Sequence, residues 1–266
     1  MTEERLPLTP PSAPADGGAP PPLVIENLVH RFGGVVAVNG VSLEVGPQER
    51  VAVIGPNGAG KTTLFRLIAG EFRPSEGRIW LFGQDVTRFP VQKRARMGLS
   101  RTYQVTNLFL NLTALENVRV ALQAGRPERW KFWGRIRPGD ELEQRARELL
   151  AQVGIAERAD VPTSDLSHGE QRQLEIAVAL ATDPKFLLLD EPAAGLSAAE
   201  RTLLREALQN LPRQLPFLLI EHDMSFAMNL SDRVLCLDNG KPIALGRPDE
   251  VRSDPHVKAV YLGRAG

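Results

Sequence analysis

The strongest pattern in the chain is a set of short, uninterrupted apolar runs, each of which ends in polar residues. The runs cover residues 51–54, 186–189 and 217–220. Runs of this length without a polar position are typical of strands buried on both faces, as in parallel sheets. Ligands of such sheets bind at the carboxyl ends of the strands, so the polar residues after each run become candidates for chemistry. The pattern predicts an α/β fold.

Two other regions predict antiparallel pairing. Strand-like residues at 23–30, 35–38 and 41–45 are separated by short turns that leave little room for helices, so we expect an antiparallel β region before the run at 51–54. Asp238-Asn239-Gly240 lies between apolar segments and is a strong hairpin signal. Residues 1–22 are rich in Pro, Ala and Gly, and we expect them to form a disordered tail.

Helical spacing dominates residues 105–165. Thr113 and Glu116 stand at capping-box spacing at the start of a helix expected over 112–124. A second amphipathic helix is indicated by apolar residues at helical spacing, namely Leu142, Ala146, Leu149, Leu150 and Val153. Because this stretch lies between two α/β halves, we interpret it as an inserted α-helical subdomain.

Two features of these regions leave their role open. Trp130, Phe132 and Trp133 lie in an irregular stretch of the insert, and they could form a small local core or touch a partner or membrane surface. Basic residues 93, 94 and 96 lie in a short helical segment, and we interpret them as its solvated face.

Residues 55–63 carry the clearest chemical motif. They read G-P-N-G-A-G-K-T-T between the run at 51–54 and a helical segment at 64–69, which fits the P-loop pattern in residues and in context. Its glycines would let backbone N–H groups face phosphate oxygens, and the positive end of the next helix faces the same anion. Lys61 can neutralise charge on the β- and γ-phosphates, and the Thr62 hydroxyl can ligate Mg²⁺. The sequence therefore predicts a nucleoside triphosphate site.

The other two apolar runs end in residues that suit the same chemistry. Asp190 and Glu191 follow the run at 186–189; the first could help to hold Mg²⁺ and the second could accept a proton from an attacking water. His222 follows the run at 217–220, where a ligand contact or a structural role is open. Gln104 ends another strand-like stretch, and it could place a water, reach a metal or be structural.

Two more candidates lie outside these runs. Phe32 is in the first turn, where its ring could stack on a base or pack locally. Ser167 is a good N-cap for the helix that follows, and with Gly169 it could form a second anion site at that helix N-terminus.

Composition narrows the setting. The 266 residues carry a formal net charge of +0, so a nucleic-acid partner is not expected. The single cysteine, Cys236, lies in an apolar stretch and is expected to be buried. No apolar run approaches the roughly 20 residues that a membrane span needs, and the first residues do not read as a signal peptide. Any action at a membrane would need a separate spanning partner.

The order of these motifs resembles that of the ATP-binding cassette (ABC) ATPases over roughly residues 22–263. The most specific part is Leu166-Ser167-His168-Gly169-Glu170, a Leu-Ser-x-Gly signature that precedes the strand ending in Asp190 and Glu191. The resemblance implies a P-loop NTPase fold with a RecA-like mixed sheet core, the N-terminal antiparallel region and the helical insert at about 105–165, all within one ATPase domain over 23–263.

The resemblance also implies the site. Phe32 would stack on adenine of ATP, and Asp190, Thr62 and Gln104 would hold or sense Mg²⁺. Glu191 would be the general base, His222 would contact the γ-phosphate, and Gln104 and Lys61 would assist catalysis. The phosphates would be wrapped by the P-loop residues, which are Gly55, Pro56, Asn57, Gly58, Ala59, Gly60, Lys61, Thr62 and Thr63. Ser167 and Gly169 would bind the γ-phosphate held by a second ATPase subunit, identical or paralogous, in a head-to-tail dimer.

Residues 100–104, 112–118, 193–196 and 261–263 look like those of the ATPase subunits of branched-chain amino-acid importers. This implies transmembrane permease partners, an indirect link to a substrate-binding protein, and a peripheral location on the cytoplasmic face of the inner membrane. Importers of urea or short amides and lipopolysaccharide exporters share much of the pattern and stay open as alternatives. A non-transport ABC protein is disfavoured by the single cassette and short insert.

Overall fold

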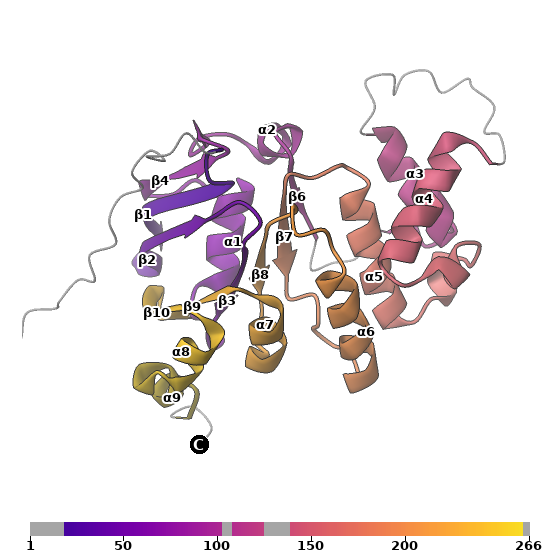
Figure 1. The fold of residues 1–266 in the computed structure, drawn as a ribbon. Coiled ribbons are helices and arrows are strands. Elements are labelled where there is room, and N and C mark those ends of the chain that lie inside the picture. The colour runs from indigo at the N-terminus through magenta and orange to yellow at the C-terminus, as the bar shows by residue number, and fades with distance from the viewer. Residues whose placement is uncertain (1–18, 103–107, 125–138, 263–266) are drawn as a thin grey trace, which may run out of the picture.

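The computed structural model describes residues 19–102, 108–124 and 139–262, which form two sheets with helices between and around them (Figure 1). The smaller sheet is antiparallel and has the strand order β2-β1-β4-β5. Its strands are β1 (Leu23–Phe32), β2 (Val35–Val45), β4 (Glu76–Leu81) and β5 (Gln84–Asp85). The antiparallel β region predicted near the N-terminus is therefore confirmed, and two strands from after the P-loop join it.

The larger sheet has six strands in the order β10-β9-β3-β8-β7-β6. Strands β9, β3, β8, β7 and β6 run parallel, and β10 pairs with β9 in the antiparallel sense, which confirms a mixed sheet core. The strands are β3 (Arg50–Ile54), β6 (Leu99–Arg101), β7 (Phe186–Asp190), β8 (Phe217–Ile220), β9 (Arg233–Asp238) and β10 (Lys241–Gly246). The hairpin predicted at residues 238–240 joins the last two.

Helix α1 (Lys61–Ala69) lies between the two sheets (Figure 1). Its buried apolar residues, such as Leu64 and Phe65, share one core with β1 and β2 on one side and with alternate residues of the large sheet on the other. The large sheet contributes Val51, Leu188 and Leu218 to this core. Successive side chains of a strand point to opposite faces, so the continuous apolar runs supply two separate cores.

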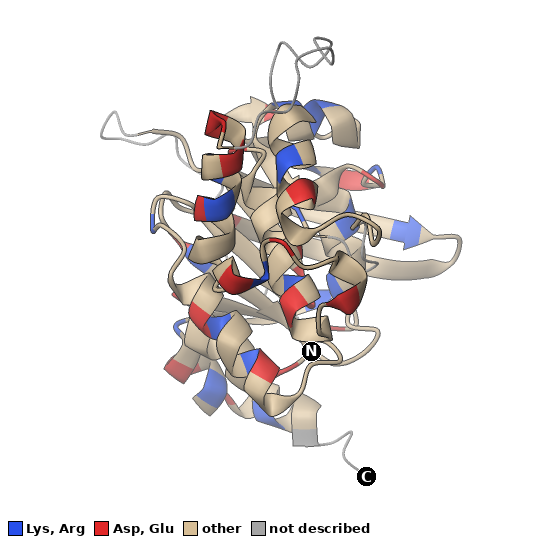
Figure 2. Ribbon diagram, turned by 90° about the vertical axis from the view of Figure 1, so that its right-hand side faces the viewer, with Lys and Arg blue, Asp and Glu red and all other residues tan. Residues whose placement is uncertain are grey.

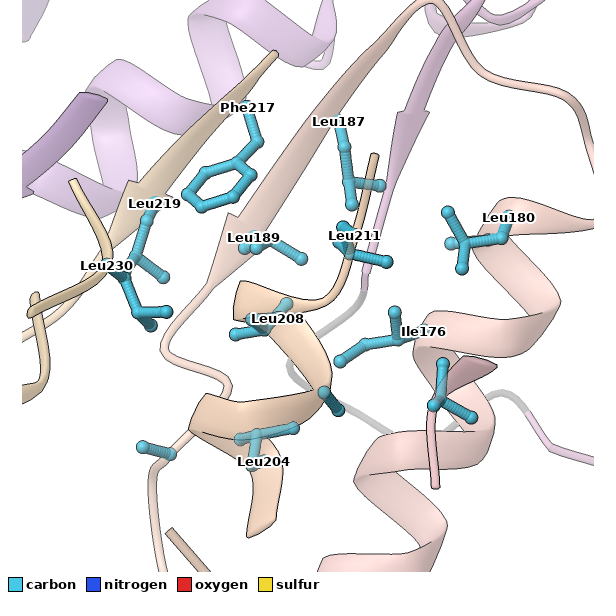
Figure 3. Close-up of a cluster of buried hydrophobic side chains, with 14 of the residues drawn as sticks. Ile176, Leu180, Leu187, Leu189, Leu204, Leu208, Leu211, Phe217, Leu219 and Leu230 are labelled. Atoms are coloured by element: carbon cyan, nitrogen blue, oxygen red, sulfur yellow. The ribbon is translucent and has the colours of Figure 1, made fainter. Parts of the chain in front are cut away.

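The other face of the large sheet is covered by α5 (His168–Leu180), α6 (Ala198–Gln209) and α7 (Met224–Leu230). Figure 3 shows Leu187 and Leu189 of β7 pointing toward Leu208 and Leu211, at and just after the end of α6, with Ile176 of α5 alongside. Leu219 of β8 points toward Leu230 of α7. These residues are at most 4% exposed. Burying each of them stabilises the fold by about 1.5–3 kcal/mol.

The predicted insert contains α3 (Ala114–Ala124), α4 (Glu141–Gln152) and two 3-10 turns, Ala156–Arg158 and Thr163–Asp165. Its predicted capping box is present, because Thr113 N–H donates to Glu116 Oε2 over 2.8 Å and Glu116 N–H donates to Thr113 Oγ1 over 3.2 Å. Asp140 caps α4 in a similar way. Acidic and basic segments are interspersed over the face shown in Figure 2. Trp130, Phe132 and Trp133 lie outside the described residues.

The interpretation of the basic residues at 93–96 as a solvated face is wrong for Arg94. This residue lies in α2 (Val91–Arg96) and is 0% exposed. Its guanidinium donates to the carbonyls of Leu67 and Ile68 at the end of α1 and to Val86 O, over 2.6–2.8 Å. Burial lowers the pKa of Arg94 to about 10. A five-donor guanidinium suits a site with several unsatisfied carbonyls, which explains how its charge is tolerated.

The chain ends in two helices, α8 (Pro248–Ser253) and α9 (Pro255–Leu262), that pack beside β9 and β10. Cys236 is fully buried in β9, as predicted, and burial raises the pKa of its thiol to about 12. Within the described residues, none of the helices has the length and apolar character needed to cross a bilayer.

Candidate functional site

The predicted site residues gather at one edge of the large sheet because their strands are parallel neighbours. Val53 of β3 pairs with Ile220 of β8, and Ile220 pairs in turn with Asp190 of β7. Just beyond, Glu191 N–H donates to Ile220 O over 2.8 Å, and Glu221 N–H donates to Val53 O over 3.2 Å. Three parts of the site therefore lie side by side at this edge: the P-loop, the carboxylates of Asp190 and Glu191 at the end of β7, and the segment that carries His222.

Two P-loop glycines are required by the close approach of neighbouring backbone. Gly55 and Gly60 have φ angles of 150° and 99°. A Cβ on Gly55 would lie 2.3 Å from Leu237 O, and one on Gly60 would lie 2.3 Å from Ala37 O. No side chain could occupy either position without moving the surrounding strands. Gly60 is also the N-cap of α1 and offers no side-chain cap, so the first N–H groups of that helix face the loop.

The hairpin turn between β9 and β10 supports this loop, a contact that the sequence patterns did not indicate. Gly240 N–H donates to Ala59 O over 3.0 Å, and Gly240 O accepts from Asn39 N–H over 2.8 Å. The hairpin signal itself was visible in the sequence, but its position against the P-loop depends on β9 pairing beside β3. The turn thus holds the P-loop at Ala59 and links it to β2.

Lys61 points into the P-loop. It is 5% exposed, and its Nζ donates to Gly55 O over 2.7 Å and to Pro56 O over 3.0 Å. Burial lowers the pKa of Lys61, and the charges of Glu191, Glu221 and Asp190 oppose that shift. A cation at the start of a helix, where the first backbone N–H groups are also free to donate, is suited to phosphate oxygens.

Asp190 is suited to a metal ion. It is 7% exposed, and its Oδ1 is buried without a hydrogen-bond partner. Burial, helped by the charge of Glu191, raises the pKa of Asp190 to about 6. A cation beside the carboxylate would relieve both the burial and the repulsion. In the described part of the chain no three His, Cys, Asp or Glu residues converge as a metal cluster. The unpartnered carboxylate oxygen of Asp190 fits Mg²⁺, which is usually held by one or two protein oxygens, phosphates and water.

Two threonines lie at the site, Thr62 at the end of the P-loop and Thr102 beside Asp190. Thr62 lies in the first turn of α1, directly after Lys61, so its hydroxyl belongs to the same loop-to-helix junction. Thr102 follows β6 and is 5% exposed; its Oγ1 accepts from Asp190 N–H over 3.4 Å. Gln104, two residues further, lies outside the described residues. Its assignment stays a prediction.

Glu191 has an unusual backbone conformation. Its φ is 46°, in the left-handed region that non-glycine residues seldom adopt. A turn follows, in which Ala194 N–H donates to Glu191 O over 3.1 Å. His222 lies across from this turn and its side chain is 55% exposed. Between them lies Glu221, a fully buried carboxylate that the sequence patterns did not single out. In the sequence, Glu221 is distinguished only by its position directly after the apolar run at 217–220.

Phe32 takes part in local packing and is also accessible. Its ring makes edge contacts with His30 and Phe72, with centroids 4.5 and 5.4 Å apart, and it remains 47% exposed. His30 and Phe72 are themselves stacked. Both interpretations of Phe32 therefore fit the structure, because the contacts hold the ring while leaving part of it open to a base.

Ser167 and Gly169 lie at the start of α5, which covers the face of the large sheet opposite α1 (Figure 1). The Ser167 N-cap is confirmed, since its Oγ accepts from Glu170 N–H over 3.2 Å and Glu170 Oε2 accepts from Ser167 N–H over 2.8 Å. Gly169 N–H donates to Glu200 Oε1 over 2.9 Å. The structure thus does not bring the Leu-Ser-x-Gly segment to the sheet face that α1 covers.

The fold and the site together define a P-loop nucleotide-binding protein of the ATP-binding cassette class. The family model for ABC transporters matches residues 38–194, and that for the branched-chain amino acid ATP-binding cassette transporter matches residues 241–266. The chain belongs to the ABC transporter family and is an ATP-binding subunit with ATPase activity.

Several curated proteins are similar along nearly their whole length. The chain is 43% identical to the high-affinity branched-chain amino acid transport ATP-binding protein LivG of Escherichia coli K12, over 92% of this chain and 99% of that protein. It is 40% identical to BraF, of the same description, from Pseudomonas aeruginosa, with the same coverage. It is 35% identical to the lipopolysaccharide export ATP-binding protein LptB of Haemophilus influenzae, over 91% and 97%.

Solved structures agree with the fold. The ATP-binding cassette MJ1267 in its ADP conformation has a TM-score of 0.80 at 31% identity, covering 92% of this chain and 99% of that one. The ATP-binding cassette MJ0796, described as a dimeric post-hydrolysis state bound to ADP and phosphate, has a TM-score of 0.70 at 25% identity, covering 85% and 98%.

Proposed function

We propose that this ATPase energises the import of branched-chain amino acids through separate transmembrane permease subunits. The observation that carries the proposal is the match of residues 241–266 to the branched-chain amino acid cassette family. The identities to LivG and BraF, 43% and 40%, support it, against 35% to the lipopolysaccharide exporter LptB. Lipopolysaccharide export is the second candidate, because that relative also matches along nearly its whole length; import of urea or short amides is a third.

In this proposal the P-loop binds the phosphates of ATP. Lys61, held inside the loop by two carbonyls, turns its charge toward the β- and γ-phosphates. Phe32 stacks on the adenine with the exposed part of its ring. Asp190 and Thr62 hold Mg²⁺, with Gln104 beside them. When bound, Mg²⁺ neutralises the negative charge that develops on the phosphate oxygens during phosphoryl transfer.

Hydrolysis then depends on the residues that follow β7 and β8. Glu191 accepts a proton from the water that attacks the γ-phosphorus. His222, exposed at the end of β8, donates a hydrogen bond to the γ-phosphate and holds it against the water. The left-handed backbone of Glu191 is consistent with a catalytic role, because strained residues are found where surroundings fix a reacting group.

The complete site needs a second ATPase subunit, identical or paralogous. Ser167 and Gly169 lie at a helix N-terminus, where backbone N–H groups suit an anion, and this helix is on the sheet face opposite α1. We propose that they bind the γ-phosphate held by the partner's P-loop in a head-to-tail dimer. The dimeric state described for MJ0796 supports such an assembly. ATP joins the subunits, and loss of the γ-phosphate separates them.

The remaining partners follow from this cycle. The permease subunits span the membrane, a substrate-binding protein acts on them from the other side, and this subunit sits peripherally on the cytoplasmic face of the inner membrane. No nucleic-acid partner is included, since the net charge of the chain is +0.

One experiment tests both the substrate and the chemistry. The chain is reconstituted with its permease in liposomes, and ATP turnover is measured with binding protein loaded with leucine, isoleucine or valine. We expect these amino acids to stimulate turnover and urea or lipopolysaccharide to have no effect. Glu191→Gln should stop turnover while ATP still binds. Stimulation by lipopolysaccharide alone would select the export candidate, and normal turnover in Glu191→Gln would refute the assignment of the base.

A further inference from the structure

The proposed roles leave one buried titratable group of the site unused. Glu221 lies between β8 and His222 and is 0% exposed. It follows Ile220, which pairs with Asp190, so Glu221 lies next to the turn that begins at Glu191. Burial raises the pKa of Glu221. A carboxylate is costly to bury, so one kept at this position needs compensating hydrogen bonds.

Those hydrogen bonds link two different segments of the site. Glu221 Oε1 accepts from Ala193 N–H over 2.9 Å, in the turn after Glu191. Glu221 Oε2 accepts from His222 N–H over 3.2 Å and lies 3.7 Å from His222 Nδ1. One carboxylate thus holds the turn of the general base with one oxygen and the neighbouring histidine with the other.

The backbone of Glu191 explains why such a link is useful. A φ of 46° is unfavourable for a non-glycine residue, and it persists only when its surroundings hold it. Glu191 N–H is fixed to Ile220 O on one side. The bond from Ala193 N–H to Glu221 fixes the turn on the other side, two residues later. The side chain of Glu191 is therefore aimed from both ends of a short, strained segment.

We propose that Glu221 is a positioning residue for ATP hydrolysis, which holds the general base Glu191 and the γ-phosphate contact His222 in a fixed relation to each other. This inference rests on the proposed roles of those two residues. Glu221 acts through its neighbours: it takes no proton from the water and its carboxylate is not a metal ligand. Its loss should slow the chemical step without weakening ATP binding, because the P-loop contacts are separate.

The test compares Glu221→Gln and Glu221→Asp with the wild-type chain, each assembled with its permease. Gln keeps the shape but can accept only one of the two backbone N–H groups, and Asp keeps the charge but is one methylene too short to reach both. We expect kcat to fall about tenfold or more in both variants, while KM for ATP stays within twofold. A residue that merely stabilised the fold would lower the thermal midpoint and leave kcat per folded molecule unchanged.

Glu49→Gln is the matched control. Glu49 also anchors a turn, accepting from Gly46 N–H over 2.7 Å, but it lies at the opposite end of β3. We expect its kcat to equal that of the wild type. Wild-type kcat in Glu221→Gln, or in Glu221→Asp, would overturn the positioning role. If Glu191→Gln also turned over normally, the proposed function of the site would fail; if only the Glu221 variants did so, the positioning role alone would fail.

Discussion

Replacing Asp190 with Asn is expected to stabilise the protein at neutral pH while removing its catalytic capacity. Burial, with the neighbouring charge of Glu191, raises the pKa of Asp190 from 3.8 to about 6. A shift of about two pKa units corresponds to about 3 kcal/mol of unfavourable free energy for the ionised form in the fold. Asn has nearly the same shape and carries no charge, so it avoids this cost.

The sign of the pH dependence follows from the raised pKa. Below pH 3.8 the carboxyl group is protonated in both folded and unfolded chains, and its stabilising contribution is fully present. As the pH rises toward 6, the unfolded chain releases its proton first, so stability is lost. The loss is complete about one pH unit above the folded pKa, near pH 7. The stability advantage of Asp190→Asn should therefore be near zero at pH 3 and reach about 3 kcal/mol above pH 7.

Urea unfolding at a series of pH values, with EDTA and without nucleotide, measures this difference. Asp183→Asn serves as the matched control, because Asp183 is exposed and should give no such gain. Adding Mg²⁺ and ATP should stabilise the wild type and have much less effect on Asp190→Asn, since the variant lacks the carboxylate proposed to hold the ion. Equal stability of variant and wild type at pH 7.5, or a gain that did not change with pH, would refute the reasoning.

Three other substitutions give further tests. Arg94→Met should destabilise the fold by about 3–5 kcal/mol in denaturant unfolding, because it removes a buried donor to the end of α1; unchanged stability would contradict this. Phe32→Ala should raise the KM for ATP about tenfold, the loss of roughly 1.4 kcal/mol of base stacking, whereas Phe32→Trp should preserve it; equal KM values would exclude adenine stacking. Gly60→Ala should abolish ATP binding in fluorescent-nucleotide titrations, since its Cβ would lie 2.3 Å from Ala37 O; near-normal affinity would contradict that clash.

Much of the fold was predictable because its strands and helix caps depend on residues that are close together in the sequence. The apolar runs that became β3, β7 and β8 are buried on both faces, so uninterrupted hydrophobicity was a sufficient signal. The caps at Thr113 and Ser167 were predictable for the same reason, since a capping box needs only residues three apart. The edge where the P-loop and the carboxylates meet follows from the parallel order of those strands.

The features that could not be predicted depend on contacts between distant segments. Arg94 has the sequence surroundings of an exposed helix, and only the docking of α2 against the end of α1 buries it. Glu221 gains its position from the turn after β7, and Gly240 supports the P-loop because β9 lies beside β3. Strand β4 joins the small sheet by pairing with β1, and β5 joins it by pairing with β4. Contacts between such distant segments produce no hydrophobic periodicity in the sequence, so they could not be predicted from it.

The central place of β3 has a consequence for how the protein folds during synthesis. Its two neighbours, β8 and β9, begin only at Phe217 and Arg233, whereas β3 itself ends at Ile54. A nascent chain therefore emerges with an apolar strand whose edges stay unpaired until most of the polypeptide has been translated. Such high contact order slows folding and exposes aggregation-prone edges. We expect the ribosome-bound chain to associate with chaperones that cover extended apolar segments, and to acquire a nucleotide site only after β9 has left the exit tunnel.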